Sequence, residues 1–549
     1  MFVEAQTFLL LAPEVVLTLA ATAIFVGGAF VRNRKMWVAA ALASYLAAFA
    51  ALAFSGSPWF AGVVDSGPLT VDPLSLGLRW LAVGAGFILT LAISQPASDE
   101  LASEMLGALM LVMVGVMLTA SANELVLLFV GLEMISVPTY VLLYLGRKDR
   151  GAGEATMKYF YLSLLSSALL LYGFSFLYGI GGTTLIVGNS HQPGIREALA
   201  GGAAAAGNAA LLHLAPLALV LVVAGLGFKL AAAPFQFYAP DVYQGTTNAN
   251  AGILAVAPKV AGIAALIRLL LLILPVESVD AGKLAQFAWQ LGLALSVLTM
   301  TIGNICALWQ NNIRRLLAYS SIAHSGYLLI GFSVAAANIA GLPGEPAAGG
   351  VTAMLFYVAV YSLATMGAFS ALAYLGSAER EVNTVDELSG LGKSQPFTAA
   401  ALAIFMFSLA GIPPLAGFFG KLTLFVGAVK LAVSADGPMS AWFCALAIIG
   451  ALNAAIAAAY YLRIIAVMYF QPVTTETPAQ GGPGALAAAV LCAVLVVVAG
   501  FLPGSLVALA SKSEAGLTRP SAPAPAVAQI PRPLAPWKPD LRPVRDVRH

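Results

Sequence analysis

Residues 211–245 read LLHLAPLALVLVVAGLGFKLAAAPFQFYAPDVYQG, an apolar run long enough to cross a bilayer but interrupted by Pro234 and Pro240. Proline removes a backbone donor and breaks a helix, and a bilayer tolerates broken backbone only inside protein or beside a wet cavity. The stretch therefore predicts a discontinuous membrane helix. A second run, FTAAALAIFMFSLAGIPPLAGFFGKLTLFVGAVKLAV at 397–433, is interrupted by the Pro413–Pro414 pair. Paired interrupted helices in the two halves of a chain indicate a transport site.

The composition of the whole chain excludes a water-soluble globule. Hydrophobic residues make up 60% and charged residues 9%, with a mean hydropathy of +0.90, whereas soluble domains carry about 25% charged residues. Because roughly 20 apolar residues span a bilayer as a helix, the pattern predicts an all-α integral membrane protein with about 14 transmembrane helices. The expected spans are 7–30, 36–54, 72–94, 103–121, 123–145, 156–179, 211–245, 249–274, 284–307, 312–334, 350–375, 397–433, 441–470 and 484–510.

These spans divide the chain into five parts. We expect a three-helix segment at 1–100, a first repeat at 101–275, a second repeat at 284–470, a last helix at 484–510 and a Pro-rich disordered tail at 511–549. The repeats comprise helices 4–8 and 9–13, with helices 7 and 12 discontinuous. Because five is an odd number, the second repeat begins on the opposite side of the membrane, which makes the repeats inverted.

Lysine and arginine in short loops predict the orientation. Basic loops follow odd-numbered helices, and we expect the loop at 147–150 in the cytoplasm and both termini in the periplasm of a bacterial inner membrane. The basic residues are Arg32, Arg34, Lys35, Arg147, Lys148, Arg150, Arg314, Arg315, Arg380 and Lys393, whereas the loops after even helices carry only Arg196 and Lys283.

Four charged residues with apolar sequence on both sides carry the argument for a proton route: Glu133, Lys229, Lys259 and Lys421. A charge at mid-membrane costs about 2.5–3.5 kcal/mol on the mildest scale, so such residues need a partner, water or a function. Burial disfavours the charged form and couples neighbouring groups, which suits proton transfer. His324, in a tenth span, is a candidate relay. The alternatives are lysines that snorkel to the interface or only pair structurally, and a structural histidine.

Two spacings support a repeat. Glu133 and Lys229 are 96 residues apart (229 − 133), and His324 and Lys421 are 97 apart (421 − 324). Each pair joins a polar residue in an unbroken helix to a lysine in a broken one.

Glu154 and Lys158 stand at i and i+4 at the start of the sixth span. They form either an ion pair at the helix entry or a pair that positions the proton site.

Several motifs resemble the proton-translocating antiporter-like proteins, a family that includes three large membrane subunits of complex I and subunits of cation/proton antiporters. The similarity spans roughly residues 100–470 and favours the complex I branch with lysine at the Lys421 site and no long lateral helix after the core. The motifs are SANELVLLFVGLEMISVPTYVLLYL, GFKLAAAPFQFYAPDVYQG, VAPKVAG, NNIRRLLAYSSIAHSGYLL and LAGIPPLAGFFGK.

The resemblance implies a role for each charged site. Glu133 with Lys229 would form the first charge pair, Lys259 the central lysine, His324 part of the connecting axis, and Lys421 the site that faces the outlet. One departure is Gln236, which stands where the family often has histidine. Glutamine cannot titrate, so this position can relay only through water or a hydrogen bond.

The sequence lacks cofactor motifs: we find no cysteine cluster for an iron–sulfur centre and no dinucleotide-binding glycine fingerprint after a strand. The resemblance therefore implies that NADH, flavin, iron–sulfur clusters and quinone bind to partner subunits, with no cofactor on this chain. The expected partners are other membrane subunits of complex I, especially neighbouring antiporter-like and small membrane subunits, and the lipid bilayer, but no nucleic acid.

The favoured interpretation is a proton-moving subunit of a redox-driven translocase. Two alternatives remain at this point: a subunit of a multisubunit sodium/proton antiporter that uses the same residues without redox coupling, and a structural membrane scaffold whose charges only pair.

Overall fold

A computed structural model describes residues 10–55, 65–95, 99–147, 149–188, 192–200, 209–274, 279–340, 349–377, 380–435, 437–473 and 479–517. Within these ranges the long helices are α2 (Ala12–Gly28), α3 (Arg34–Ser55), α4 (Pro73–Ala92), α5 (Ala102–Ser121), α6 (Leu125–Gly146), α7 (Arg150–Gly181), α9 (Ala215–Leu230), α11 (Asn248–Ala265), α12 (Val279–Leu308), α13 (Ile313–Ile339), α14 (Gly350–Leu375), α16 (Pro396–Ala410), α17 (Ala416–Ser434), α18 (Pro438–Phe470), α19 (Gly482–Phe501) and α20 (Pro503–Leu517). The shorter elements are α8 (Ile195–Leu199), α10 (Ala239–Gly245), α15 (Leu391–Ser394), the 3₁₀ turns η2 (Ala209–Leu214), η3 (Gln236–Tyr238) and η5 (Asp386–Leu388), the π-helix η4 (Leu266–Leu271), and the strands β1 (Asp65–Ser66) and β2 (Leu69–Thr70).

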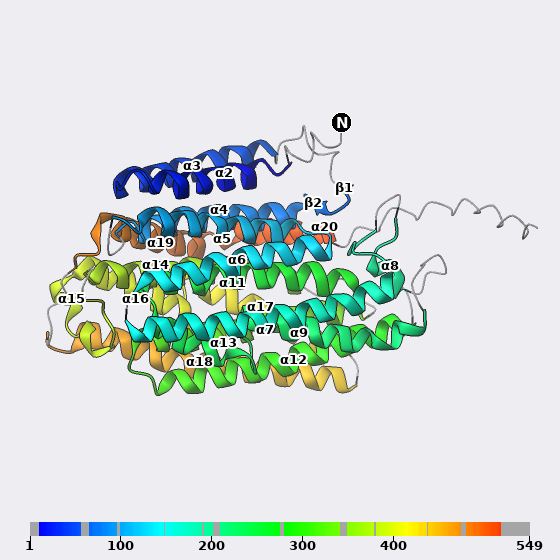
Figure 1. The fold of residues 1–549 in the computed structure, drawn as a ribbon. Helices are drawn as coiled ribbons and strands as arrows, with labels where there is room; N and C mark the ends of the chain where they lie inside the picture. The colour runs from blue at the N-terminus through cyan, green and yellow to red at the C-terminus, as the bar shows by residue number, and fades with distance from the viewer. Residues whose placement is uncertain are drawn as a thin grey trace, which may run out of the picture.

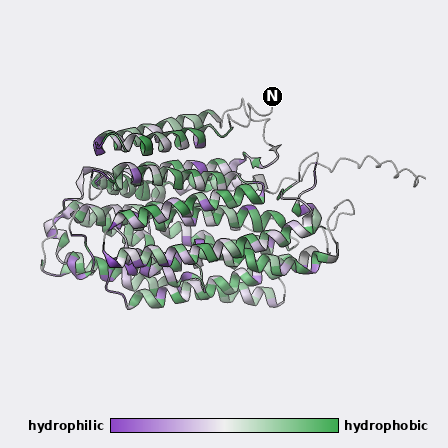
Figure 2. Ribbon diagram, viewed as in Figure 1, coloured by the Kyte–Doolittle hydropathy of each residue, from purple (hydrophilic) through white to green (hydrophobic). Residues whose placement is uncertain are grey.

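The predicted all-α membrane fold is confirmed, with one two-stranded hairpin, β1–β2, as the sheet of the described residues. Thirteen described helices are long and apolar enough to cross a membrane, and α2 is a shorter apolar helix. Since α16 and α17 are the two halves of the predicted twelfth span, these helices account for the 14 predicted spans. Figure 2 shows hydrophobic residues over most of the length of the helices.

The helices lie side by side in one bundle (Figure 1). The α2–α3 pair lies at one edge, and α12 and α18 lie at the other. Helices at the centre of the bundle are more buried than those at its edges. The most apolar 18-residue stretch of α11 is completely buried inside the protein, whereas only 22% of the corresponding stretch of α3 is buried. The helices α5, α13 and α14 are also mostly buried, so α11, α13 and α14 form the interior in which charged groups need partners.

Loops that follow even-numbered spans meet at one end of the bundle. Isolated bridges join Leu69 to Ala122 and Glu124 to Leu185, which links the loops after spans 2, 4 and 6. The guanidinium of Arg79, near the start of α4, donates to the Leu10 carbonyl, and α20 lies at the same end (Figure 1). The first and last described residues therefore lie at the same end of the bundle, as an even number of spans requires.

Loops that follow odd-numbered spans meet at the opposite end. A bridge joins Asn312 to Thr384, and Arg314 pairs with Glu381. Arg147 and Asp149 line the same cavity as Asn312 and Arg314. Each five-span unit, α5–α11 and α12–α18, has the same order: three unbroken helices, one broken helix and one unbroken helix. This order matches the two predicted repeats.

Both predicted breaks are present. Helix α9 ends at Leu230 and is capped by Ala231 in the left-handed conformation (φ 52°), after which η3 and α10 follow. Helix α16 ends at Ala410 and is capped by Gly411 (φ 87°), and α17 begins five residues later. Pro234, three residues after the first cap, and Pro413, two residues after the second, prevent the helices from continuing.

The end of the chain differs from the prediction. The last span, expected at 484–510, ends at Phe501, and a separate helix, α20, follows it. Residues 511–517, expected to be part of a disordered tail, are therefore helical. Ala510 and Ser513 are buried, and Glu514 accepts hydrogen bonds from the backbone and side chain of Thr352. The apolar residues of α20 continue those of the last span, so hydropathy alone does not separate the two helices; Pro503 suits the first turn of the new helix. The rest of the predicted tail lies outside the described residues.

Candidate functional site

The first charge pair joins α6 to α9. Glu133 Oε1 lies 3.9 Å from Lys229 Nζ and accepts a 2.5 Å hydrogen bond from Ser167 on α7. Lys229 also donates to the Ser136 hydroxyl, one turn along α6 from Glu133. The lysine is buried, whereas the Glu133 side chain is 27% exposed. Two serines thus hold the predicted pair, with the carboxylate nearer to the surface of this chain.

The central lysine lies between α11 and α13. Lys259 Nζ donates a 2.5 Å hydrogen bond to Ser321 Oγ and lies 5.4 Å from the centre of the Tyr361 ring. The Tyr361 hydroxyl also donates to Ser321, over 2.9 Å. Among the described residues, no carboxylate lies within ion-pair distance of Lys259, so its ammonium group is held by a hydroxyl and an aromatic face.

His324 lies one turn further along α13 and connects two tyrosines. Its Nδ1 is 2.5 Å from the Tyr357 hydroxyl of α14, and its Nε2 is 2.9 Å from the Tyr461 hydroxyl of α18. Its ring centre is 5.0 Å from that of Tyr361, which binds the same serine as Lys259. The imidazole therefore joins the surroundings of Lys259 to α14 and α18.

Lys421 on α17 folds back onto the break that precedes it. Its Nζ donates to the carbonyl oxygens of Leu409, over 2.8 Å, and Ala410, over 3.0 Å, and lies 5.0 Å from the centre of the Tyr327 ring. The last carbonyls of a helix have no partner within the helix and carry partial negative charge. The break thus creates the acceptors that hold a buried cation.

Burial excludes one alternative for the lysines. Lys229, Lys259, Lys421 and His324 are each at most 4% exposed. A lysine that snorkels would place its ammonium at a membrane surface, whereas these ammonium groups lie among protein oxygen atoms.

The two breaks can be aligned on their caps and prolines. Gly411 follows Ala231 by 180 residues, and Pro414 follows Pro234 by the same interval. The same shift places Lys421 opposite Asp241, which lies in α10. Lys229 lies before its break and Lys421 after its own, so the near-equal spacings of 96 and 97 residues do not make the two lysines equivalent.

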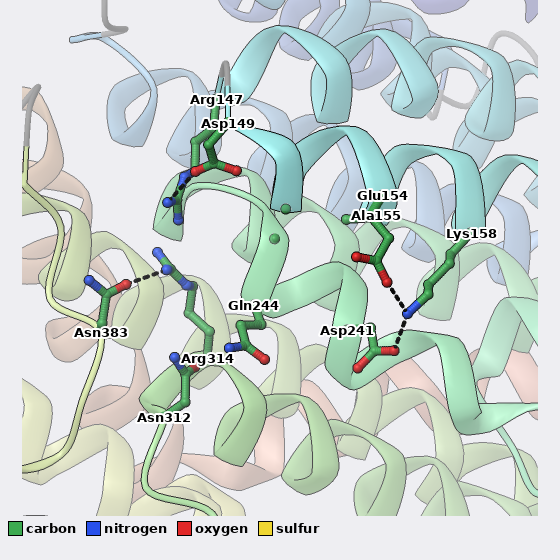
Figure 3. Close-up of a pocket in the computed structure, with 12 residues that line it drawn as sticks. Arg147, Asp149, Glu154, Ala155, Lys158, Asp241, Gln244, Asn312, Arg314 and Asn383 are labelled. Atoms are coloured by element: carbon green, nitrogen blue, oxygen red, sulfur yellow. Dashed lines mark hydrogen bonds and ion pairs between the residues drawn. The ribbon is translucent and has the colours of Figure 1, made fainter.

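Asp241 belongs to a charged cluster at the end where the odd-numbered loops meet. The predicted ion pair of Glu154 and Lys158 is present at 2.7 Å, and Lys158 Nζ also lies 2.7 Å from Asp241 Oδ2. Asp241 Oδ1 lies 2.6 Å from Arg315 Nη1. Figure 3 shows Glu154 and Asp241 pointing toward Lys158 from two different helices. These side chains are partly exposed, so the pair at the start of α7 lies apart from the buried lysines.

The cluster borders a cavity of about 500 Å³. On the far side of it, Asp149 caps α7 by accepting from the Ala152 N–H, over 2.8 Å. That backbone N–H and the nearby Arg147 hold the pKa of Asp149 below its usual value, despite partial burial. The cavity is lined by Arg147, Asp149, Gly151, Glu154, Ala155, Lys158, Asp241, Gln244, Gly245, Asn312, Arg314 and Asn383.

The sequence reasoning missed three buried arginine pairs. Arg79 of α4 binds Glu14 at 2.7 and 2.5 Å, and Arg268, in the π-helix η4, binds both oxygens of Asp72. The third pair is Arg314 with Glu381. The signal was available for Arg79 and Arg268, since each is an arginine inside an apolar run.

The hydroxyl groups that contact Lys229, Lys259 and His324 were also not predicted from the sequence. Ser136, Ser321, Tyr357, Tyr361 and Tyr461 each contact a charged site residue or His324. Nothing in the local sequence separates them from other buried hydroxyls. Among the described residues, no group of three His, Cys, Asp or Glu could hold a metal ion.

Comparison with known proteins agrees with this geometry. A family model described as NADH:quinone oxidoreductase/Mrp antiporter, TM, matches residues 122–448. NADH-quinone oxidoreductase subunit N of Trichlorobacter lovleyi is 36% identical over 474 residues, which cover 84% of this chain and 88% of the relative. Subunit N of Rubrobacter xylanophilus is 35% identical over 518 residues, which cover 93% and 99%.

Solved structures show the same fold. A chain of respiratory complex I from Thermus thermophilus is 29% identical, with a TM-score of 0.69 over 90% of this chain and 98% of that one. A chain of the Mrp complex from Dietzia sp. is 20% identical, with a TM-score of 0.74 over 93% and 97%; at that identity the likeness shows the fold alone. The chain therefore belongs to the antiporter-like family of membrane proteins, in its NADH–quinone oxidoreductase subunit N branch.

Proposed function

We propose that this chain moves protons across a bacterial inner membrane as a subunit of NADH–quinone oxidoreductase, through Glu133, Lys229, Lys259, His324 and Lys421. The observation that carries the proposal is the arrangement of Lys259 and Lys421. Each is a buried cation that, among the described residues, has only neutral oxygen atoms and an aromatic ring beside its ammonium group. A structural ion pair needs a counter-ion, and the part of the chain that the structure describes places none beside these two lysines.

The Glu133–Lys229 pair is the first site of the proposed route. At 3.9 Å the two charges interact without direct contact, so a change at Glu133 alters the stability of the ammonium form of Lys229. Lys229 also lies close to α11, because a methyl group added at Gly262 would be 3.7 Å from the lysine Cβ. Gly262 is one turn from Lys259, which brings the first site next to the helix of the second.

The hydroxyl and imidazole groups between Lys259 and Lys421 supply the relay. A neutral imidazole donates from one nitrogen and accepts at the other, and each nitrogen of His324 faces a tyrosine hydroxyl that can take either role. When Tyr461 gives its proton to Nε2 and Nδ1 gives its proton to Tyr357, the tautomer changes and one proton crosses the ring. The groups stay neutral because Tyr461 takes a proton from its other partner, Ser320, and Tyr357 passes its own proton onward. Tyr327, beside Lys421, lies 5.8 Å from His324 between ring centres.

Gln236, at the start of η3, occupies the position where the family often has histidine. Its Oε1 is buried and has no hydrogen-bond partner among the described residues. A water molecule could satisfy that oxygen, which is the form of relay that a residue unable to titrate permits. A relay through this position would therefore need water where the family often uses an imidazole.

The redox chemistry belongs to partner subunits in this proposal. NADH, flavin, iron–sulfur clusters and quinone act there, and quinone reduction drives the protons by changing a charge or conformation next to Glu133. The partners are neighbouring antiporter-like and small membrane subunits. The partly exposed Glu133 carboxylate suits such a contact, since the surface of this chain reaches it.

Substitution of Lys229 tests the proposal in the whole complex. Lys229→Ala should leave the complex assembled but reduce NADH–quinone turnover and proton pumping, measured in membrane vesicles. Lys430, an exposed residue of α17, provides the control, because Lys430→Ala removes a lysine outside the route. Wild-type pumping by assembled Lys229→Ala complex would refute the proposal and favour a scaffold.

A further inference from the structure

The short helix α10 connects the charged cluster to the central lysine. Residues two apart on a helix point about 200° apart, so Asp241 and Tyr243 face opposite sides of α10. Asp241 binds Lys158 of α7 and Arg315 of α13, at 2.7 and 2.6 Å. The Tyr243 hydroxyl lies 3.4 Å from Ser321 Oγ.

The hydroxyl of Ser321 requires a hydrogen-bond acceptor, and Tyr243 can supply it. A serine hydroxyl has two acceptor sites and one donor, and Lys259 and Tyr361 both donate to it. The proton of Ser321 is left for a third partner, and the Tyr243 oxygen is close enough to accept it. The position of Tyr243 therefore affects how Ser321 holds the ammonium group of Lys259.

The rest of α10 packs tightly against its neighbours, so a displacement of Asp241 would also displace Tyr243. A methyl group at Gly245 would lie 2.5 Å from Ala155 Cβ and 2.8 Å from the Gly151 carbonyl, so the end of α10 packs directly on α7. Gln244 accepts a 3.0 Å hydrogen bond from Arg315. At its other end α10 follows the break, and there the charged contacts of Asp241 join it to both neighbouring helices.

The alignment of the two breaks points to the same residue independently. Asp241 occupies the place that Lys421 occupies in the second repeat. In each repeat a charged residue stands seven positions after the aligned proline: Asp241 after Pro234, and Lys421 after Pro414.

From these contacts we infer that Asp241 is a positioning residue for Lys259: its ion pairs with Lys158 and Arg315 hold α10 so that Tyr243 completes the hydrogen bonds of Ser321. This inference rests on the proposed function, since it assigns Asp241 to the central proton site. The other charged groups that face Asp241 across the cavity are Glu154, Arg147, Asp149 and Arg314.

A double-mutant cycle in the intact complex tests the inference. Asp241→Asn and Tyr243→Phe should each lower NADH–quinone turnover per assembled complex by about two- to tenfold, the size of coupling within one hydrogen-bond network. Both should displace the pH profile of turnover in the same direction, and the double variant should be no slower than the slower single variant. Asp241→Glu, which keeps the charge, should restore most of the turnover.

The control is Asp99→Asn, which removes a surface carboxylate that pairs with Arg34 at 3.4 Å. It should leave turnover and pH profile unchanged. Multiplicative losses in the double variant, or an unchanged pH profile with less assembled complex, would overturn the inference and leave Asp241 a structural residue. If Asp241→Asn does not assemble, Tyr243→Phe decides alone, and a wild-type pH profile in that variant overturns the inference.

Lys259→Ala separates this inference from the proposed function. Normal pumping by Lys259→Ala would refute the proposed route itself. Loss of pumping in Lys259→Ala, together with independent effects of Asp241→Asn and Tyr243→Phe, would refute only the positioning role.

Discussion

Lys421 Nζ lies 2.8 Å from the carbonyl oxygen of Leu409, a residue twelve positions earlier in the chain and on the other side of a helix break. The lysine thus binds a backbone oxygen that only an interrupted helix leaves free. This relationship explains why the break and the charge occur together, and it leads to the first prediction.

Lys421→Ala should abolish most proton pumping while the complex still assembles. The substitution removes a titratable group and leaves the carbonyls of Leu409 and Ala410 without their present donor, a loss of roughly 1–3 kcal/mol per buried acceptor unless water replaces it. Pumping is measured in membrane vesicles and compared with Lys430→Ala on the same helix. Equal pumping by the two variants would contradict the role of Lys421.

Ser321→Ala should lower turnover on the order of tenfold. Hydrogen bonds to charged groups contribute about 1.5–3 kcal/mol, and this change removes the acceptor shared by Lys259 and Tyr361. Ser362→Ala is the matched control, since that buried hydroxyl donates only to the Val358 carbonyl of its own helix among the contacts described. A loss as large in Ser362→Ala would show that turnover responds to general packing in this region.

The sequence could predict the spans, the two breaks and the charged residues, because each depends on local patterns. Apolar length marks a span, proline marks a break, and a lysine such as Lys259 is conspicuous in an apolar run. Partners that come from distant helices could not be predicted in this way. Ser321 is 62 residues from Lys259, and Tyr461 is 137 residues from His324, so only the packing of the bundle brings them together.

The end of the chain shows a different reason for failure. Helix α20 is marked locally by Pro503, but its apolar residues run on from the last span, and a window of hydropathy merges the two. Its role depends on Glu514, whose carboxylate binds Thr352 in the first turn of α14, 162 residues earlier. An acceptor at a helix N-terminus is stabilising, but the sequence around Glu514 does not identify which helix it caps.

Truncations should distinguish α20 from the tail. The sequence predicts that residues 515–549 are dispensable for proton movement, and the structure moves the expected boundary to residue 518, after α20. Removal of 518–549 should leave assembly and pumping intact, whereas removal of 503–549 should reduce the amount of assembled complex, because it exposes surface on α4 and α14. The measurement is the yield of complex on a native gel, and equal yields would show that α20 adds no stability.

The orientation of the bundle is the last prediction. The first and last described residues lie at one end, and the loops after odd-numbered spans lie at the other. Those loops contain Arg147, Arg150, Arg314 and Arg315, and basic residues near span ends favour the cytoplasm. We therefore expect both termini in the periplasm. The seven basic residues from Lys512 to Arg548 oppose this, but most of them lie beyond the 15–20 residues next to a span that govern insertion.

A thiol reagent that does not cross membranes can decide the orientation in intact cells. Gly153→Cys is a suitable internal site, because a Cβ there meets no atom within 4 Å, and Ser521→Cys reports on the tail. The native cysteines Cys306, Cys444 and Cys492 are first replaced. Labelling of Ser521→Cys alone is the expected result, because nine of the 14 predicted spans separate the loop at 147–150 from the tail, and an odd number places them on opposite sides. Labelling of Gly153→Cys alone would show that the protein is inserted the other way round, with the basic loops outside. Labelling of both would place the tail and the loop on the same side of the membrane, which would contradict the predicted count of 14 spans.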